Sequence, residues 1–535
     1  MSYRYEIIEN KAWLLDIKNN KYSECDLPKL FHHDILDENK NLIESQFRAS
    51  NSLVGIFSTS QTQRFGKNKR GNIIYLVKPI NNLLPSFLIS YGGKLKGKIA
   101  IKFKYTNWQN KLPSGEIIEL IGNYTDENLN KILMYNYNIY PKNIKLSNLK
   151  NSEEDNINRK EYNASIFSID PDNCEDIDDA LSIDIVNDEV IIGVHIAQPI
   201  YWLSINDIYQ KLKYQFSTLY MPDSRKDLWG EFVTKQSSLS ENTKKAAYTI
   251  LFYYQDYNLV KIEDFPSYIT NNKVLSYDNA DNYEDAKKIK EYTSKLIQTN
   301  DYHDLVSFWM LQTNQYIGNK CKNSEIKIPY RVNNENFFED NDKFDELPLE
   351  IRNKFFSKKI DSAYYSFDEF RHETLSIEHY CHFTSPIRRL VDTWIHYYLT
   401  YQLDNSDYKL DCSLLNYFDS QSKKFHRQIN LIESINKLFE KSDSVEKIAY
   451  IYKIISNNII EIYIPELGFT KLRLYNIKFD YLIINQRSEE ELTIEFGNTI
   501  FKFKVGDTIN IKIDKLDDIL PKNKLLITLV DQIIG

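Results

Sequence analysis

The sequence predicts a multidomain α+β protein, in which a small β-barrel region, a central domain of mixed helices and strands, and a second small barrel follow one another. Three observations predict this fold class. The chain has 535 residues, more than one hydrophobic core usually organises, since a domain takes about 150 residues. Short strand-like runs dominate up to about residue 150 and again from about residue 445. Helical apolar spacing appears between these two regions.

The N-terminal region is rich in short runs with the composition of β-strands. These runs are Asn51 to Thr59, Asn72 to Lys78, Lys98 to Lys104 and Ile117 to Ile121. Residues 51–110 contain ten Lys or Arg and no Asp or Glu, so this stretch carries +10 and the rest of a chain of net charge −8 carries −18. A local field of that kind attracts phosphate backbones. The alternative is a solvated basic face on an ordinary domain.

Aromatic residues are interleaved with these lysines and arginines. They are Phe57, Phe65, Tyr75, Phe87, Tyr105 and Trp108. Small antiparallel barrels that bind single strands have this composition, because aromatic faces stack on bases while cations follow the phosphates. The alternative is that the rings fill the core of the barrel.

The middle of the chain alternates between strands and helices. Residues 151–160 are polar and are predicted to be a linker. Strands are then expected over 180–186 and 190–197, joined by a hairpin turn at Asn187-Asp188. The apolar spacing predicts helices over Glu284 to Gln298, Leu305 to Lys320 and Ile387 to Leu403. Later strands are expected over Ile459 to Ile464, Thr493 to Phe503, Thr508 to Ile513 and Leu525 to Val530.

Composition excludes several classes of protein. With 42% hydrophobic and 14% aromatic residues, the chain is not of a disordered or low-complexity type. No apolar run approaches the roughly 18 residues of a membrane-spanning helix, and the N-terminus lacks the apolar stretch of a signal peptide. Five scattered cysteines form no CxxC pair, which supports neither a disulfide framework nor a thiolate zinc site. We therefore expect a soluble, cytoplasmic protein without a membrane partner, with an organelle or a viral setting as the alternatives.

The most informative segment is an acidic cluster, IDPDNCEDIDDAL, at residues 169–181. Its acidic residues are Asp170, Asp172, Glu175, Asp176, Asp178 and Asp179. Because the cluster directly precedes an apolar hairpin, we expect some of these carboxylates at the edge of a core. Two carboxylates about 4 Å apart repel by roughly 4 kcal/mol at an effective dielectric of 20. A divalent cation such as Mg²⁺ relieves that repulsion, and it can activate water and stabilise the leaving oxygen of a phosphodiester.

Two other interpretations of the acidic cluster were weighed. A solvated acidic loop is the simplest alternative. An EF-hand calcium loop begins correctly at Asp170 and Asp172, but it needs Gly where Glu175 stands and a bidentate Glu where Leu181 stands. The EF-hand interpretation therefore fails.

A second segment, YCHFTSPIRRLVD at residues 380–392, is suited to binding phosphate. Pro386 is expected to open a helix with Ser385 or Thr384 near its cap, so that backbone N–H groups lie beside Arg388 and Arg389. The alternative is an ordinary helix start with two surface arginines.

Together these segments resemble the catalytic domain of the ribonuclease II and ribonuclease R family, the RNB domain. The resemblance is carried by IDPDNCEDIDDALSI, by GVHIA at 193–197 and by HYCHFTSPIRR at 379–389. The run WQNKLPSGEIIELIG at 108–122 is similar to the end of the family's cold-shock-type barrel. The resemblance implies a cold-shock-like OB region at 1–150, an RNB catalytic domain at 160–440 and a C-terminal RNA-binding OB barrel at 445–535.

The resemblance implies a processive exoribonuclease that hydrolyses single-stranded RNA from its 3′ end to nucleoside 5′-monophosphates. By the same resemblance, Asp170 and Asp179 would hold Mg²⁺, Asp178 would be essential to the two-metal chemistry, and Asp176 would support the site. The residues expected to contact RNA are Tyr220, Tyr277, Glu378, Arg388 and Arg389. We expect a monomer whose partners are the 3′ ends of single-stranded RNA.

The sequence departs from the family pattern at three places. Ser307 and Phe308 stand where the family often has paired glutamates, and Gln198 stands where it has Asp in HIAD. The family's PMLP stretch is not recognisable near DLWGEF. The Ser307 and Phe308 substitutions motivate a second hypothesis, a catalytically silent RNA-binding relative. A third hypothesis is an exonuclease directed at DNA, which lacks the 2′-OH of RNA.

Overall fold

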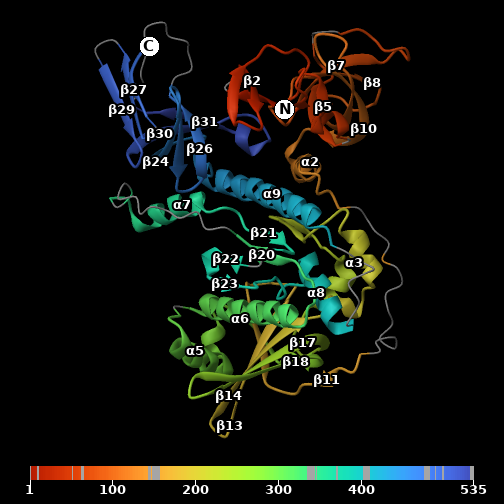
Figure 1. The fold of residues 1–535 in the computed structure, drawn as a ribbon, viewed down its shortest axis with the longest axis vertical. Helices are drawn as coiled ribbons and strands as arrows, with labels where there is room; N and C mark the ends of the chain where they lie inside the picture. Colours follow the sequence, from red (N-terminus) through yellow and green to blue (C-terminus); the bar gives the residue numbers. More distant parts are fainter. Residues whose placement is uncertain are drawn as a thin grey trace. The chain divides into compact units, whose positions relative to one another are not determined.

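The computed structural model describes the chain except for a set of short segments. These are residues 1, 9–10, 51, 62–64, 142–145, 147–156, 300, 334–343, 345, 369–370, 402–409, 475–481, 489, 497–498 and 531–535. The described residues form two compact units, one from 1–140, 427–447 and 511–530, the other from 141–426 and 448–510 (Figure 1). Most of the predicted linker at 151–160 lies outside the described residues.

The N-terminal part begins with a five-stranded sheet that the sequence analysis did not predict. Its order is β3-β2-β1-β4-β5. The strands are β1 (Tyr3–Ile8), β2 (Lys11–Asp16), β3 (Lys21–Glu24), β4 (Ile35–Leu36) and β5 (Leu42–Glu44). A short helix, α1 (Gln46–Ala49), leads from this sheet to the next. Tyr5, Leu14 and Leu36 form the small buried core of this five-stranded sheet.

A closed five-stranded barrel follows, with the order β10-β8-β7-β6-β9. Its strands are β6 (Leu53–Ser58), β7 (Ile73–Pro79), β8 (Phe87–Tyr91), β9 (Lys98–Asn107) and β10 (Ser114–Asn123), and α2 (Leu129–Asn136) comes after them. A Cβ on Gly55 would lie 2.6 Å from Val77 Cγ1, so only glycine allows β6 and β7 this close approach. The predicted barrel is confirmed, and the four predicted strands are four of its five.

The aromatic residues of this region belong mainly to the barrel's interior. Phe57, Tyr75 and Phe87 are buried, and Tyr105 and Trp108 pack against the same cluster. These five rings therefore fill the core of the barrel, which was the alternative to stacking on bases. The basic residues of 51–110 remain the feature of this region that can attract phosphates.

The central part is built on a seven-stranded sheet with the order β11-β18-β17-β14-β13-β12-β19. Its strands are β11 (Lys160–Glu161), β12 (Ile166–Asp170), β13 (Asp179–Val186), β14 (Glu189–Ala197), β17 (Lys244–Gln255), β18 (Asn258–Thr270) and β19 (Lys273–Ser276). The predicted β13–β14 hairpin is confirmed. Its turn residues, Asn187 and Asp188, have φ of 51° and 65°, a left-handed conformation that Asn and Asp tolerate better than most residues.

Helices cover this sheet, with α5 near β13 and α6 near β14 (Figure 1). The helices of the central part are α3 (Ile205–Lys211), α4 (Glu231–Ser237), α5 (Glu284–Leu296), α6 (Tyr302–Asn323), α7 (Leu349–Lys359), α8 (Leu390–Tyr401) and α9 (Cys412–Leu438). Short two-stranded sheets pair β15 (Leu219–Met221) with β16 (Ser224–Lys226), β20 (Tyr330–Val332) with β21 (Tyr364–Ser366), and β22 (Arg371–His372) with β23 (Ile377–Glu378). The helices predicted over 284–298 and 305–320 correspond to α5 and α6.

The C-terminal strands form two sheets among the described residues, and neither is a closed barrel. One has the order β26-β25-β24-β30-β31 and the other β27-β28-β29. The strands are β24 (Ser444–Ser456), β25 (Ile459–Ile464), β26 (Gly468–Arg473), β27 (Leu482–Arg487), β28 (Glu491–Phe496), β29 (Thr499–Lys504), β30 (Thr508–Lys515) and β31 (Leu525–Leu529). The single strand predicted over 493–503 is wrong, since two antiparallel strands, β28 and β29, occupy it.

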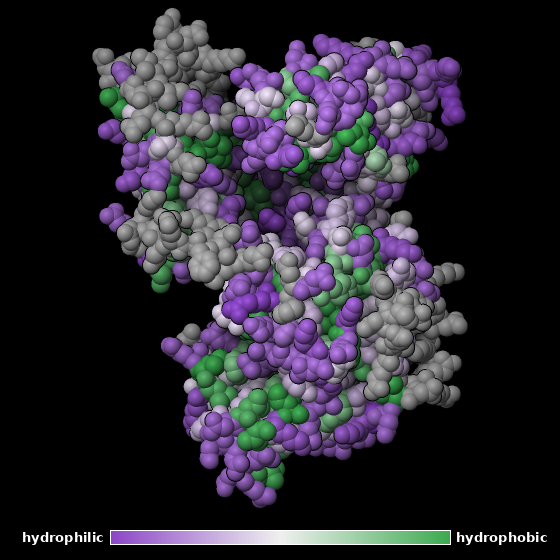
Figure 2. All heavy atoms as spheres, in the orientation of Figure 1, coloured by the Kyte–Doolittle hydropathy of each residue, from purple (hydrophilic) through white to green (hydrophobic). Residues whose placement is uncertain are grey.

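Apolar side chains reach the surface at one end of the central sheet (Figure 2). The exposed ones in the β13–β14 and β17–β18 hairpins are Ile185, Val186, Tyr257, Leu259 and Val260. This is the end of β13 opposite to Asp179, so these residues are not part of the acidic cluster. Within the described parts of the chain, no helix has the length and apolar character needed to cross a membrane.

Candidate active site

The acidic loop connects β12, which ends at Asp170, to β13, which begins at Asp179. Ile177 in this loop is buried in the same apolar cluster as Ile387. That shared cluster holds the loop against the segment that carries Arg388. Five of the six acidic residues line one cavity together with this segment, so these carboxylates do lie at the edge of a core.

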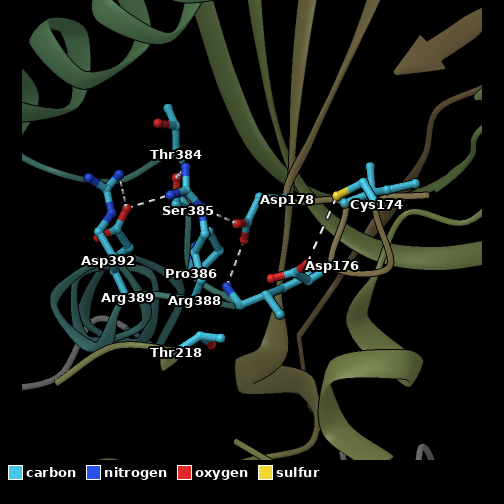
Figure 3. Close-up of polar contacts among 12 residues, drawn as sticks. Cys174, Asp176, Asp178, Thr218, Thr384, Ser385, Pro386, Arg388, Arg389 and Asp392 are labelled. Carbon is cyan, nitrogen blue, oxygen red and sulfur yellow. Dashed lines mark hydrogen bonds and ion pairs between the residues drawn. The ribbon is translucent and has the colours of Figure 1, made fainter. Parts of the chain in front are cut away.

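Asp178 is bound at both of its carboxylate oxygens (Figure 3). It is 4% exposed. Its Oδ1 accepts the backbone N–H of Ile387 over 2.7 Å, and its Oδ2 accepts Nε–H of Arg388 over 3.1 Å. Burial raises the pKa of Asp178 to about 7, although the Arg388 charge and the Ile387 N–H act against that shift. The ionisation of Asp178 near neutral pH therefore depends on the positive charge beside it.

Among the carboxylates of the site, Asp170 and Asp179 have the least compensation of their negative charge by nearby donors and cations. Burial, with a smaller contribution from Asp176, raises the pKa of Asp170 to about 6. Burial together with the charges of Asp170 and Asp178 raises the pKa of Asp179 well above its ordinary value. The Oδ2 atom of Asp170 is buried and has no hydrogen-bond partner. Two carboxylates in this state favour a cation between them.

Asp176 is bound by two side chains of the β15–β16 hairpin. It is 8% exposed, and its Oδ2 accepts a hydrogen bond from the hydroxyl of Tyr220. Its Oδ1 accepts Nη1–H of Arg225 over 3.2 Å and lies 3.9 Å from the Cys174 thiol. Burial and the Asp176 charge raise the pKa of Tyr220, so its hydroxyl keeps its proton and acts as a donor.

The two arginines lie in a turn that precedes α8, not in its first helical turn. The helix begins at Leu390, so the start predicted at Ile387 is wrong. The helix begins later because tertiary hydrogen bonds stabilise the turn before it. The backbone N–H of Ile387 donates to Asp178. Asp392 Oδ1 accepts the backbone N–H of Ser385 over 2.8 Å and Nη2–H of Arg389 over 3.0 Å. Figure 3 shows Asp392 facing Ser385 and Arg389.

These groups border one cavity of about 810 Å³. The residues predicted from the sequence that line it are Asp170, Asp176, Asp178, Asp179, Tyr220, Tyr277, Arg388 and Arg389. Glu175 and Arg225 also line it, so five carboxylates face three arginines. One of those arginines, Arg389, is already paired with the buried Asp392. The cavity wall therefore has more carboxylates than arginines, an excess of negative charge that a cation would compensate.

One predicted RNA-contacting residue is placed differently. Glu378 is exposed on β23 and forms an ion pair with Arg371 over 3.3 Å, and it is not among the residues that line the cavity. Tyr277 follows β19 and does line the cavity, with its ring 5.6 Å from the ring of His303. Burial raises the pKa of Tyr277 to about 12.

Sequence reasoning missed several residues of the cavity wall. They include Arg225 and a row on α6, Val306, Met310, Leu311 and Asn314. Asn314 Oδ1 accepts the amide of Phe383 over 2.8 Å, and its Nδ2 donates to the Tyr380 hydroxyl over 3.2 Å, so α6 fixes the arginine segment. The spacing of the α6 row, with positions 306, 310 and 314 on one helical face, is a signal that the sequence contains.

The part of the chain that contains this site matches a known protein family. The RNB domain model matches residues 159–299 and 284–405. Residues 159–405 of the chain belong to the RNB domain family. The matched part contains the acidic loop, the Tyr220 hairpin and the arginine turn, which confirms the resemblance that the sequence motifs predict.

One curated relative of the RNB chain is ribonuclease R of Aquifex aeolicus (strain VF5), 23% identical over 398 residues. The alignment covers 57% of this chain and 56% of that protein, so the chain spans only about half the length of that relative. The identity is too low to carry the relative's activity to this RNB chain by itself.

Solved structures share the fold. The apo form of Mycoplasma genitalium RNase R has a TM-score of 0.78 at 17% identity, covering 99% of this chain and 100% of that one. The same protein in complex with ribose methylated single-stranded RNA has a TM-score of 0.76 at 17% identity over the same shares. Yeast Ssd1, a pseudonuclease, has a TM-score of 0.67 at 12% identity, covering 99% of this chain and 96% of that one. The fold of this RNB chain is thus that of RNase R, and a protein without nuclease activity has a similar fold.

The departures from the RNB pattern have different structural settings. Ser307 lines the cavity, whereas Phe308 is not among the lining residues and packs edge-on against Trp309. Gln198 lies in a buried network, where it accepts from Arg159 and donates to Thr400 Oγ1 over 2.9 Å. The change at Gln198 is therefore a change in the core of the RNB domain, while the change at Ser307 alters the cavity wall.

The residues of the RNB site fit a hard divalent cation. Within the described residues, no three Asp, Glu, His or Cys side chains are arranged to enclose a metal ion by themselves. Mg²⁺ is usually bound by one or two carboxylates, with water and substrate phosphates completing its shell. The unpartnered Oδ2 of Asp170 and the buried carboxylate of Asp179 supply that kind of incomplete site.

Proposed function

We propose that this chain is a Mg²⁺-dependent exoribonuclease that hydrolyses single-stranded RNA processively from its 3′ end to nucleoside 5′-monophosphates. The observation that carries the proposal is the cavity that Asp170, Asp176, Asp178 and Asp179 line together with Arg388 and Arg389. Carboxylates of this kind are suited to hydrolysis of a phosphodiester, and an arginine is suited to holding it.

Asp170 and Asp179 would hold Mg²⁺, which when bound lowers the pKa of a water and stabilises the charge on the leaving oxygen. Asp178 is proposed as a catalytic residue beside them. Asp178 is bound by Arg388 and by the Ile387 amide, which orient its two oxygens. Asp176 would orient the Tyr220 hydroxyl, since the two groups already share a hydrogen bond.

The remaining cavity residues are proposed to bind the 3′ end of the RNA. Arg388 and Arg389 would contact phosphates, and Tyr277 would stack on a terminal base. Tyr220 would orient the scissile end of the RNA from the cavity wall, with its hydroxyl hydrogen held by Asp176. Glu378, on β23, is proposed to contact the last nucleotide at the rim, after release from its exposed ion pair with Arg371.

The flanking regions are proposed to guide the RNA. The cold-shock-like OB region at 1–150, with the ten basic residues of 51–110, would attract the backbone. The C-terminal region at 445–535 would bind RNA as the counterpart of an OB fold, and the RNB domain at 160–440 would hydrolyse it. We propose a cytoplasmic monomer, because none of these steps needs a second subunit.

A second candidate function is binding of RNA without hydrolysis. Ser307 at the cavity wall favours it, because a carboxylate that the family often has there is absent. The two functions differ in one observable, the release of nucleotides.

The test is a degradation assay on a short, 5′-labelled single-stranded RNA with Mg²⁺ and with a chelator. The proposal expects progressive shortening from the 3′ end, release of nucleoside 5′-monophosphates, and no reaction with the chelator. Binding without any product at saturating Mg²⁺ would support the silent RNA-binding function instead. A DNA oligomer of the same sequence is the matched control, and equal hydrolysis of DNA would contradict the assignment to RNA.

A further inference from the structure

Arg225 is a cavity residue to which the proposed reaction assigns no role. Its guanidinium contacts three carboxylates: Nε lies 2.7 Å from Asp227, Nη1 lies 3.2 Å from Asp176, and Nη2 lies 2.9 Å from Glu175. Arg225 lies in strand β16, just before the stretch DLWGEF, near which the family's PMLP run is not recognisable.

The β15–β16 hairpin places Arg225 directly opposite Tyr220. The register pairs Leu219 with Lys226, Tyr220 with Arg225 and Met221 with Ser224. Residues directly opposite in an antiparallel pair point to the same face. Tyr220 and Arg225 thus extend from one side of the hairpin toward the same side chain, Asp176.

The two side chains hold Asp176 from both of its oxygens. Tyr220 donates its hydroxyl hydrogen to Oδ2, and Arg225 donates Nη1–H to Oδ1. With Oδ1 fixed by the guanidinium, the orientation of the carboxylate is set, and so is the direction from which the Tyr220 hydroxyl approaches.

We propose that Arg225 is a positioning residue for the hydrolytic reaction: it fixes Asp176, and through Asp176 it fixes the Tyr220 side chain that orients the scissile end of the RNA. This inference rests on the proposed nuclease function. Arg225 does not bind the RNA phosphate itself, because Nε, Nη1 and Nη2 each already face a carboxylate. Loss of Arg225 therefore lowers the rate of the bound complex and leaves the affinity for RNA nearly unchanged.

The experiment is a double-mutant cycle with Arg225→Met, Tyr220→Phe and the double variant, measured as single-turnover nucleotide release and as RNA affinity. Arg225→Met is expected to slow release by about 10- to 100-fold with an RNA Kd within about threefold of wild type. In the Tyr220→Phe background the same change is expected to slow release by less than about threefold, because the two residues act through one carboxylate.

Two further variants separate positioning from general effects. Lys226→Met removes a neighbouring charge of the same hairpin that does not line the cavity, and it is expected to leave the rate unchanged. Arg225→Lys keeps the charge but not the planar fork, and it is expected to recover part of the lost rate. If Arg225→Met does not fold, as judged by its thermal melting, Arg225→Lys takes its place in the cycle.

The outcomes discriminate between the hypotheses. Additive losses in the two backgrounds, or a loss of RNA affinity as large as the loss of rate, would overturn the positioning role while the nuclease function stands. A wild-type protein that releases no nucleotide with Mg²⁺ would overturn the proposed function and this inference with it.

Discussion

Arg388 donates its Nε–H to Asp178 over 3.1 Å, while the amide of the preceding residue, Ile387, donates to the other oxygen of the same carboxylate over 2.7 Å. A buried carboxylate is thereby bound by a side chain and a backbone group of one short turn. Because Asp178 is 4% exposed, its negative charge depends on these donors for compensation.

Arg388→Met is expected to lower the free energy of unfolding by about 1–3 kcal/mol at pH 8, because it removes one donor from the ionised Asp178. The loss should be smaller at pH 5, since the pKa of Asp178 is raised to about 7 and the group is then protonated. Urea unfolding at both pH values measures this difference. Arg371→Met, which removes the ion pairs of Arg371 with Glu373 and Glu378 at the surface, is the control and is expected to cost less than about 1 kcal/mol. Equal losses at the two pH values would contradict the role given to Arg388.

Gly318 on α6 is expected to tolerate no side chain. A Cβ there would lie 1.6 Å from the carbonyl oxygen of His379, at the start of the segment that carries the two arginines. Gly318→Ala should lower the free energy of unfolding by about 1–3 kcal/mol and also slow nucleotide release, because the segment must move. Gln315→Ala on the same helix is the control. A Gly318→Ala protein with wild-type stability and rate would show that this contact does not position the segment.

Binding of Mg²⁺ is expected to weaken in acid. The pKa of Asp170 is raised to about 6, so below that pH the metal-free site holds a proton that must leave before the carboxylate binds a cation. The Mg²⁺ concentration that gives half of the maximal rise in melting temperature should increase about tenfold from pH 7 to pH 5. Asp170→Asn should lose most of this response. A half-saturating concentration that does not change over this range would argue against Asp170 as a ligand.

Acid should also unfold the protein through a buried histidine outside the cavity. Burial lowers the pKa of His195 to about 3, so between pH 6.5 and 3 only the unfolded chain binds its proton. The stabilisation by neutral His195 is therefore present above pH 6.5 and is lost as the pH falls below it. His195→Gln should be less stable at pH 7, but its free energy of unfolding should fall by about 2 kcal/mol less between pH 6.5 and 5. His303→Gln, at an exposed position, should keep the wild-type slope.

The sequence was most informative where local chemistry decides the structure. Asn187-Asp188 predicted a hairpin because both residues accept positive φ, and alternating runs predicted the N-terminal barrel. The long helix α9 was missed, although Leu415, Phe418, Phe425, Ile429 and Ile435 recur on one buried face. The helical period of these apolar residues is present in the sequence, so the helix is predictable from the sequence alone.

Other features depend on contacts between distant residues. The helix α8 begins at Leu390 and not at the predicted Ile387, because the Ile387 N–H donates to Asp178, which lies more than 200 residues earlier in the chain. Arg225 was missed because its three carboxylate partners are identified only when the hairpin is placed against the acidic loop. The motif residues meet in one cavity except Glu378, whose partner Arg371 lies on the opposite strand of a short sheet.

The most direct test of the account is nucleotide release by Asp178→Asn under single-turnover conditions, with RNA binding measured on the same sample. Asp188→Asn, at the exposed β13–β14 turn, is the matched control and should behave as wild type. The account predicts that Asp178→Asn binds RNA with a Kd within about threefold of wild type while release falls by at least about 100-fold. Release at the wild-type rate by Asp178→Asn would contradict the assignment of the acidic cavity as the centre of RNA hydrolysis.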